Sequence, residues 1–475
     1  MKAIKFGTDG WRGEIGRDFT FENVELVAQA IADYFTRCPL PAARCPQVIV
    51  GYDTRFLSRE FAQTVSRVLV ANDIKVILSN QYCPTPTLSR AIVTKKARAG
   101  IMITASHNPY YFNGIKIKGD FGGSVESDVT EEIEKLLGKN KPKILSWEEC
   151  KKSKNLEIAN FLPDYKKSIK SYIDFRLLRS SKKKWKVLVD SMFGTGNGII
   201  EDLLKETNIK VTTIHSEQNP LFPGINPEPI PKNLKEAARL LKNGDYDLAV
   251  ITDGDADRIG ALRPDGKFIT PSLILSLTLL HFLKYRKWSG GVVKTISSSS
   301  LIDKITQRYN LKLWETPIGF KHICALMRKE DILIGGEESG GIGYKNYLFE
   351  RDGILSALLL TEVLCAEKRG ILGIIKDIEK EFGRFRYGRI DIHYPEEKKK
   401  GLMANLKKNP PSRLIGKRVV EIKKYDGVKL ICSDGSWLLL RLSGTEPILR
   451  IYAEAGSEKE AERFLGEGKK IAYRV

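Results

Sequence analysis

The sequence predicts an α/β fold of three similar α/β units with mixed sheets, followed by a smaller C-terminal α+β domain. Over most of the 475 residues, buried strands alternate with amphipathic helices at the spacing of βαβ units. Each of the three units places a polar loop directly beyond a buried strand. From about Phe382 the pattern changes to alternating strands with hairpin signals. A chain of this length is expected to form three or four domains of about 100–150 residues each.

Changes in composition suggest where the units begin and end. A polar, lysine-rich stretch at 139–154 marks the end of the first unit. The lysine runs at 182–184 and 398–400 are interpreted as solvated linkers or loops. The predicted domains cover residues 1–150, 151–260, 261–380 and 381–475.

The first unit opens with a glycine-rich loop, Phe6–Gly13. Its glycines allow a tight turn close to a ligand, and Arg12 is the charged group that such a loop would offer. A simple connection between strands explains the loop equally well. The expected elements are a helix at 21–35, a strand at 48–51, a helix at 61–71 that Asp53 or Thr54 could cap, and strands at 75–78 and 99–104.

Ser106 lies just beyond the strand at 99–104, in the run Ser106-His107-Asn108-Pro109. Because Asn-Pro stops a helix and favours a turn, we expect this serine on an exposed loop. Ligand sites in open α/β sheets lie beyond the carboxyl ends of strands. Ser106 is therefore a candidate covalent nucleophile, provided that a neighbour activates it. An ordinary surface turn remains the alternative, since Ser-His alone is a weak motif.

The second unit starts with a helix and a strand at 185–189 and closes with a strand at 247–251. Its loop Gly194–Gly198 has the spacing GxGxG instead of GxGxxG, and no acidic residue follows at the distance of a dinucleotide site. We therefore interpret that loop as a glycine-rich turn from strand to helix.

A cluster of carboxylates follows the last strand of the second unit. Asp253, Asp255 and Asp257 alternate with small residues, so their side chains can converge on one cation. Oxygen ligands alone favour magnesium or calcium. An EF-hand is excluded, because Arg258 and Pro264 stand where that motif requires glycine and glutamate. The alternative is a capped, solvated acidic turn.

The third unit repeats this plan and the fourth domain departs from it. Glu337 and Ser339 lie in a glycine-bounded loop suited to sugar hydroxyls, because a carboxylate accepts two hydrogen bonds with definite directions. The expected elements are buried helices at 273–283 and 354–364, strands at 291–295 and 332–334, a hydroxyl-rich loop at 297–300, a loop at 316–322, C-terminal strands at 438–440 and 449–454, and a closing helix.

A loop of the fourth domain has the groups that bind phosphate. Arg441, Ser443, Gly444 and Thr445 offer a guanidinium, two hydroxyls and backbone N–H groups within five residues. Arg450 could reach the same place from the next strand. An ordinary hairpin loop is the alternative.

The composition, through its net charge, its cysteines and its apolar runs, favours some classes of function and excludes others. The net charge of +20 fits an anionic small substrate or a nucleic acid. No recognition helix and no interleaving of aromatic and basic residues supports the nucleic acid. Seven scattered cysteines without a CxxC pair fit a reducing cytoplasm. No apolar run approaches the roughly 20 residues of a membrane span, and no signal segment opens the chain.

Together these loops supply the chemical groups that phosphoryl transfer requires. They supply a nucleophilic hydroxyl, a divalent-cation cluster, a phosphate-binding loop and a sugar-sized polar loop. Phosphoryl transfer needs mainly positioning and charge neutralisation from a protein. The sequence has no P-loop or kinase glycine loop, so we do not expect ATP as the donor.

At these residues the sequence resembles the α-D-phosphohexomutase superfamily, which includes phosphoglucomutases and phosphomannomutases. The resemblance runs nearly end to end, in the family's order. It covers Phe6–Gly13, Thr104–Pro109 with Lys116, Asp253–Arg258, Gly336–Gly341 and Arg441–Pro447. It implies four domains around a central cleft, and interconversion of hexose 1-phosphate and hexose 6-phosphate through a bisphosphorylated sugar.

The resemblance also implies roles for single residues. Ser106 would carry the phosphoryl group, and Asp253, Asp255 and Asp257 would bind Mg²⁺ together with a phosphoserine oxygen. Glu337 and Ser339 would contact the sugar, and the groups at 441–445 its non-reacting phosphate. The cleft would be lined by Arg12, His107, Lys116, Arg258, Lys294 and His322, with Lys116 the candidate general acid or base. Glucose 1,6-bisphosphate, or an equivalent, would be the activator of a cytoplasmic monomer or homodimer.

One position departs from the pattern. Gly341 stands where several members have histidine, so the resemblance implies no histidine acid or base from that loop. Gly336–Gly341, with Glu338, looks nearer to the phosphoglucomutase and phosphomannomutase branches than to phosphoglucosamine mutase. The alternatives are phosphoglucosamine mutase, a phosphatase that uses the same phosphoserine, and a non-enzymatic polyanion-binding protein.

Overall fold

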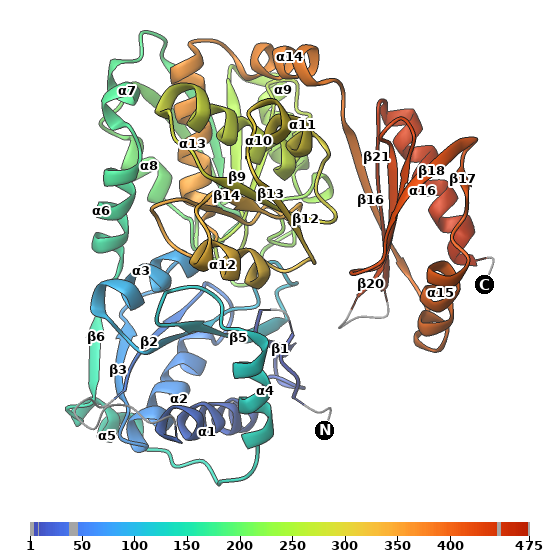
Figure 1. Ribbon diagram of the computed structural model, residues 1–475. Helices are drawn as coiled ribbons and strands as arrows, with labels where there is room; N and C mark the ends of the chain where they lie inside the picture. Colours follow the sequence, from blue (N-terminus) through green and yellow to red (C-terminus); the bar gives the residue numbers. More distant parts are fainter. Residues whose placement is uncertain (1–3, 8, 38–45, 444–447, 474–475) are drawn as a thin grey trace.

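The structure, a computed structural model, describes residues 4–7, 9–37, 46–443 and 448–473. Within these residues the strands form four sheets (Figure 1). The first three belong to α/β units and the fourth to a C-terminal domain, as predicted. In the described part of the chain, no helix is both long and apolar enough to cross a membrane.

The first unit has a mixed six-stranded sheet in the order β1-β5-β4-β2-β3-β6. Strands β2, β3, β4 and β6 run parallel, whereas β5 pairs antiparallel with β4, and β1 with β5. The strands are β1 (Trp11–Glu14), β2 (Gln47–Tyr52), β3 (Lys75–Ser79), β4 (Ala99–Ile103), β5 (Phe112–Gly119) and β6 (Leu156–Ala159). The helices are α1 (Phe21–Arg37), α2 (Ser58–Ala71), α3 (Thr85–Lys95), α4 (Ser127–Leu136) and α5 (Trp147–Lys152).

The second unit has a five-stranded sheet in the order β11-β10-β9-β7-β8. Its strands are β7 (Trp185–Asp190), β8 (Ile209–Ile214), β9 (Leu248–Thr252), β10 (Ile259–Leu262) and β11 (Phe268–Ile269). Its helices are α6 (Leu162–Tyr172), α7 (Phe175–Ser180), α8 (Ile199–Leu204), the short η1 (Pro231–Asn233) and α9 (Lys235–Asn243). Strands β6 and β11 extend their sheets past residues 150 and 260, where the sequence suggested boundaries.

The third unit has a four-stranded sheet in the order β13-β12-β14-β15. Its strands are β12 (Gly291–Thr295), β13 (Leu313–Thr316), β14 (Ile332–Gly336) and β15 (Ile342–Tyr344). Its helices are α10 (Pro271–His281), η2 (Phe282–Arg286), α11 (Leu301–Arg308), α12 (Phe320–Lys329), α13 (Gly353–Glu367) and α14 (Ile371–Phe382). Helices α10 and α13 are the two predicted apolar helices, and both are buried.

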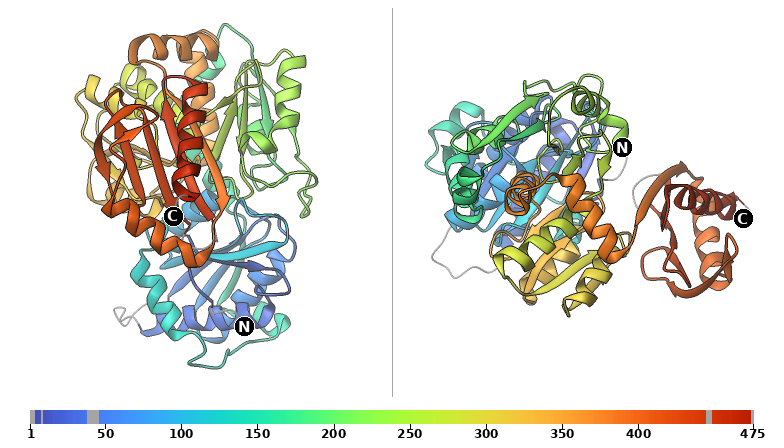
Figure 2. Two further views of the ribbon diagram at one scale, coloured as in Figure 1. Left: turned by 90° about the vertical axis from the view of Figure 1, so that its right-hand side faces the viewer. Right: turned by 90° about the horizontal axis from the view of Figure 1, so that it is seen from above.

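The C-terminal domain has an antiparallel sheet in the order β16-β21-β20-β19-β18-β17. Its strands are β16 (Arg386–His393), β17 (Arg413–Leu414), β18 (Lys417–Lys423), β19 (Val428–Cys432), β20 (Trp437–Leu442) and β21 (Ile448–Ala455). Its helices are α15 (Glu396–Lys408) and α16 (Glu458–Tyr473). Figures 1 and 2 show this domain beside the third unit, with the connection after α14.

Two local predictions are wrong. Helix α2 is not capped by Asp53 or Thr54, because it begins after Leu57 without a side-chain cap. Asp53 instead accepts hydrogen bonds from Arg55 N and Ser58 Oγ at 3.0 and 2.6 Å. The lysine run at 398–400 lies within α15 and not in a loop, and the Lys399 ammonium is buried 2.6 Å from Glu396.

The C-terminal domain is held to the third unit by a buried polar contact. Lys429 Nζ lies 4.0 Å from the centre of the Trp437 ring and donates a hydrogen bond of 2.7 Å to the carbonyl of Ile296. Glu454 accepts hydrogen bonds from Ser300 N at 2.8 Å and from Trp437 Nε1 at 3.0 Å. These bonds surround a small apolar cluster that contains Ile296 and Trp437.

Because Lys429 is buried, we expect the free energy of unfolding to depend on pH. Burial, helped by Lys294 and Lys423 and opposed by Glu315 and Glu454, lowers the pKa of Lys429 from 10.5 to about 7. Between these pH values the unfolded chain binds a proton that the folded chain does not, so the free energy of unfolding should rise with pH. Thermal unfolding from about pH 6 to pH 9 should therefore show wild type gaining stability relative to a Lys429→Met variant. A parallel response of the two proteins would contradict this prediction, and Lys424→Met, at an exposed lysine nearby, is the control.

Candidate active site

Ser106 follows β4 in a loop folded around a buried arginine. Its φ is 53°, and its amide donates a 2.8 Å hydrogen bond to Thr104 Oγ1. Arg55 Nη2 donates to the carbonyls of Ser106 and Asn108 at 2.7 and 2.6 Å, and its Nη1 to the carbonyl of Pro109 at 2.7 Å. The expected exposed position is wrong, since Ser106 is only 1% exposed. Arg55 draws the loop inward, against the second unit.

Two neighbours of the Ser106 hydroxyl come from different parts of the chain. Ser106 Oγ donates a 2.9 Å hydrogen bond to Asp253 Oδ2, across the boundary between the first two units. His107 Nδ1 lies 3.4 Å from the same Oγ. Burial, with the charges of Arg258 and Arg12 next in importance, holds the pKa of His107 well below its usual range. The imidazole is therefore neutral and Asp253 is the closer acceptor.

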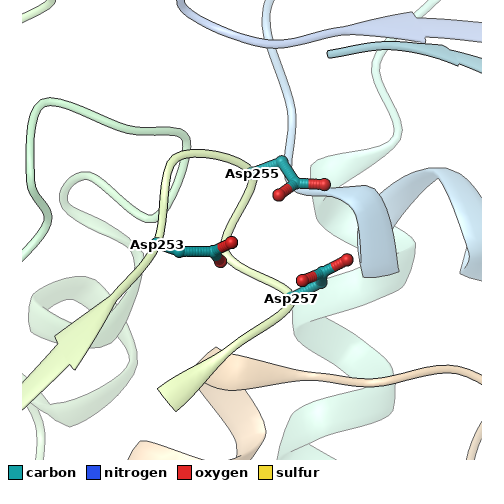
Figure 3. Close-up of side chains that lie close together, drawn as sticks. All are labelled: Asp253, Asp255 and Asp257. Carbon is teal, nitrogen blue, oxygen red and sulfur yellow. The ribbon is translucent and has the colours of Figure 1, made fainter. Parts of the chain in front are cut away.

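Asp253, Asp255 and Asp257 gather in the loop between β9 and β10 (Figure 3). All three are buried, and each offers an oxygen within 4.8 Å of the others. Ala256, between the last two, takes a φ of 54°, which bends the loop so that alternate side chains converge. Carboxylates this close repel each other unless cations compensate them.

The acidic cluster fits a divalent cation. Asp255 Oδ1 and Asp257 Oδ1 are buried without a hydrogen-bond partner. Buried oxygens left unpaired call for an ion or a water molecule. An all-oxygen set with three carboxylates suits Mg²⁺ or Ca²⁺. These three residues are thus the ones that would hold the predicted metal.

Lys116, on β5, carries the main compensating charge. Its Nζ lies 2.7 Å from Asp255 Oδ2, 2.9 Å from Asp257 Oδ2 and 3.1 Å from Asp9 Oδ2. Burial opposes the charge, but the three carboxylates outweigh it and raise the pKa of Lys116 above its usual value. The same ammonium lowers the pKa of Asp255, although burial works against that shift.

Two arginines, Arg258 and Arg351, complete the charge balance around the cluster, and a third, Arg12, lies beside the Ser106 loop. Arg258 N donates a 3.0 Å hydrogen bond to Asp253 Oδ1, and its Nε lies 3.9 Å from Asp257. Arg351, just before α13, lies 2.6 Å from both Asp257 and Asp9. Arg12 is held by a 2.6 Å hydrogen bond to Asn108 Oδ1, beside the Ser106 loop.

The predicted sugar loop follows β14. Glu337 is 5% exposed, and its Oε1 accepts a 3.0 Å hydrogen bond from Gly319 N. Burial, opposed by Arg351, raises the pKa of Glu337 to about 7. Ser339, near the end of this loop, is partly exposed. Lys294 lies beside Gly336 in the sheet and forms ion pairs with Glu315, at 3.4 Å, and with Asp303. His322 lies half-buried in the first turn of α12.

Part of the predicted phosphate loop lies outside the described residues, namely Gly444 and Thr445. Arg441 and Arg450 are direct partners on β20 and β21, so their side chains share one face of the sheet. Arg441 Nε donates a 2.7 Å hydrogen bond to Asp426. Ser443 is buried, and its amide donates a 2.9 Å hydrogen bond to the carbonyl of Ile448.

The structure thus brings together one group of the predicted residues around Ser106: Arg12, His107, Lys116, Asp253, Asp255, Asp257 and Arg258. Sequence reasoning misses Asp9, Arg55 and Arg351, which connect this group to its surroundings. A signal for Arg351 exists in the sequence, because Glu350-Arg351-Asp352 directly precedes an apolar helix. Charges in such a place are either exposed or paired.

Four family profiles match the chain in order. They are described as phosphoglucomutase/phosphomannomutase alpha/beta/alpha domain I, at residues 3–143, domain II at 163–266, domain III at 270–382, and the C-terminal domain at 394–467.

Similar proteins cover nearly the whole chain. A phosphoglucosamine/phosphogalactosamine mutase of Sulfurisphaera tokodaii is 31% identical over 98% of both chains. A phosphoglucomutase/phosphomannomutase of Thermococcus kodakarensis is 30% identical over 98% of both. The crystal structure of a candidate phosphomannomutase from Thermus thermophilus is 34% identical, covers 99% of both chains and superimposes with a TM-score of 0.86.

Proposed function

We propose that this chain, which belongs to the phosphoglucomutase/phosphomannomutase family, is a magnesium-dependent phosphohexomutase that interconverts hexose 1-phosphates and hexose 6-phosphates. The observation that carries the proposal is the 2.9 Å hydrogen bond between Ser106 Oγ and Asp253. It couples a buried hydroxyl to a carboxylate cluster suited to a divalent cation.

The residues around Ser106 are suited to a phosphoserine. A phosphoryl group on its Oγ brings roughly −1.5 to −2 charges, which cations must balance. Arg12, Lys116 and Arg258 supply them from the first and second units. A magnesium ion held by Asp253, Asp255 and Asp257 would supply further neutralisation of the phosphoryl oxygens.

The reaction requires two phosphoryl transfers in turn, the first from the enzyme to the sugar and the second from the sugar back to the enzyme. Phosphoserine 106 donates its group to the free hydroxyl of a hexose monophosphate, which gives a hexose bisphosphate and the free serine. After the sugar has turned, its other phosphate returns to Ser106 Oγ. Two groups lie where a proton can move: Lys116, which carries one, and the neutral imidazole of His107.

The remaining predicted residues bind the substrate in this proposal. Glu337 and Ser339 contact the sugar, with Lys294 and His322 nearby, and the non-reacting phosphate is bound by Arg441, Ser443, Gly444, Thr445 and Arg450. Glucose 1,6-bisphosphate would load Ser106 with its first phosphoryl group. The proposed partners are therefore small hexose phosphates, and not nucleic acid.

Two classes of hexose are the candidate substrates, namely the neutral hexoses and the amino sugars. Glu338 in the sugar loop favours glucose or mannose phosphate, by resemblance to those branches of the family. The similarity to the Sulfurisphaera tokodaii enzyme favours an amino sugar as the second candidate.

A conversion assay tests the proposal and ranks these substrates. The purified chain, with Mg²⁺ and a trace of glucose 1,6-bisphosphate, is given glucose 1-phosphate, mannose 1-phosphate or glucosamine 1-phosphate. We expect the 6-phosphate to form from at least one of them without release of free phosphate. Release of phosphate alone would show a phosphatase, and inactivity on all three would contradict the proposal.

A further inference from the structure

Position 341 in the sugar loop has to be glycine for reasons of space. The φ of Gly341 lies outside the left-handed region, so its backbone conformation is open to other residues. A Cβ there would lie 2.1 Å from Cδ of Arg351 and 2.9 Å from its Cγ. Gly340 differs, because its φ of 100° itself favours glycine. The side chain of Arg351 therefore occupies the volume that a side chain at 341 would need.

The Arg351 side chain passes through the space beside Gly341, and its guanidinium contacts three loops from three parts of the chain. Its Nη2 lies 2.6 Å from Asp9 in the glycine-rich loop and 2.6 Å from Asp257 in the acidic loop. Its Nη1 lies 3.5 Å from Glu337 Oε2 in the sugar loop. The side chain is 5% exposed, so these contacts are made away from water.

This geometry requires an arginine. A guanidinium presents several donors in one rigid plane, so it can donate hydrogen bonds to carboxylates on different sides at once. An ammonium acts instead as a point charge. The ion pair with Arg351 also stabilises the charged form of Glu337, which burial disfavours. A charged carboxylate in a fixed position is the form that accepts two hydrogen bonds from sugar hydroxyls.

We propose that Arg351 is a positioning residue that holds Glu337 in place against the sugar hydroxyls, and that Gly341 is the opening through which it does so. The inference rests on the proposed function, because the sugar contact of Glu337 does. It also explains the departure at 341. In this chain the cation beside the sugar loop comes from the segment before α13, and a side chain at 341 would displace it.

Deoxy substrates give a test that loss of stability alone does not mimic. The readout is the ratio of kcat/KM for the best hexose 1-phosphate to kcat/KM for its 3-deoxy and 4-deoxy analogues. In wild type we expect a penalty of about 10–100-fold at a hydroxyl bound by Glu337, the size of a hydrogen bond to a charged group. This penalty should be smaller in each of three variants, Glu337→Gln, Arg351→Ala and Arg351→Lys. The penalties of the three variants should agree within about threefold. Arg369→Ala, at an exposed ion pair, should keep the wild-type penalty.

A second measurement tests the link to Gly341. Gly341→Ala alone should lower kcat/KM by about tenfold or more, because the new Cβ displaces Arg351. In an Arg351→Ala background the same change should cost less than about twofold, since the atoms nearest to the new Cβ are then gone and only Glu337 Oε2, at 3.3 Å, remains close. Gly373→Ala, where a Cβ has 3.9 Å to its nearest neighbour, is the matched control and should be neutral.

The outcomes separate this inference from the proposed function. A wild-type protein that isomerises none of the hexose phosphates contradicts the proposed function. An active wild type whose Arg351 variants lose activity equally on parent and deoxy sugars overturns the positioning role. Additive losses in the Gly341→Ala and Arg351→Ala double variant overturn the role of the glycine. The Arg351→Lys variant keeps the test available if Arg351→Ala fails to fold.

Discussion

Replacing Ser106 by alanine should abolish isomerisation, with a loss of about 10⁴-fold or more in kcat. The reason is chemical, because the reaction has no other path once the hydroxyl that receives and returns the phosphoryl group is gone. The change removes one oxygen, with its hydrogen bond to Asp253 and its 3.4 Å contact with His107 Nδ1, so the fold should persist. Isomerisation with Mg²⁺ and glucose 1,6-bisphosphate measures the loss. Intact-mass spectrometry measures the phosphoryl group, which wild type should carry and the variant should lack.

Ser66→Ala provides the matched control for this experiment. Ser66 is also a buried serine of the first unit, but its hydroxyl is bonded at 2.8 Å to the carbonyl of Ala62 within α2. We expect normal turnover and normal phosphorylation in that variant. Turnover near the wild-type rate in Ser106→Ala would show that another group carries the phosphoryl group, and would remove the basis for assigning the Ser106 loop.

The positions of Ser106 and of the three aspartates follow from local sequence signals. A buried strand followed by turn-forming or small residues places a loop beyond the sheet edge, and β4 and β9 end within one residue of the predicted positions. What the sequence does not show is how these loops face each other. The burial of Ser106 depends on Arg55, which is 51 residues away. Such contacts are set by the packing of whole units, and no periodicity within one segment encodes them.

Long-range packing also explains the other differences. The lysine run around Lys399 suggests a loop because such runs are usually solvated, but this segment forms a helix whose face packs on the C-terminal sheet. The sequence does not identify Arg351 as a site residue, because the charged run at 350–352 signals a buried or exposed ion pair and does not resemble a binding motif. Its partners Asp9, Asp257 and Glu337 come from all three α/β units. A glycine that is required only for space, such as Gly341, is likewise recognisable only once its neighbour is known.

The Asp253→Asn substitution should separate activity from stability. The change removes one of three carboxylates that lie within 4.8 Å of one another. Charge neutralisation by a bound metal contributes several kcal/mol to the transition state, so kcat should fall by about 10³-fold or more. The amide oxygen can keep the hydrogen bond from Arg258 N, while the amide NH2 takes the place of the oxygen that faces Ser106 Oγ and can donate to it. The repulsion between the carboxylates is weaker. Turnover against Mg²⁺ concentration, together with thermal unfolding in EDTA, measures both effects.

The substitution should lower kcat without lowering the unfolding temperature in EDTA. A loss of activity without a loss of stability is what we expect at a metal site. Without a metal, Asp255 and Asp257 are compensated by Lys116 at 2.7 and 2.9 Å, whereas among the described residues the side-chain cation nearest to Asp253 is Arg258, at 4.0 Å. Asp253→Asn should therefore keep or raise the unfolding temperature in EDTA, while the further stabilisation that Mg²⁺ gives to wild type should be lost. Asp265→Asn, on the exposed turn after β10, should respond to Mg²⁺ as wild type does. A wild-type response to Mg²⁺ in Asp253→Asn would contradict the metal assignment, because a hard divalent cation binds an amide far more weakly than a carboxylate in an all-oxygen site.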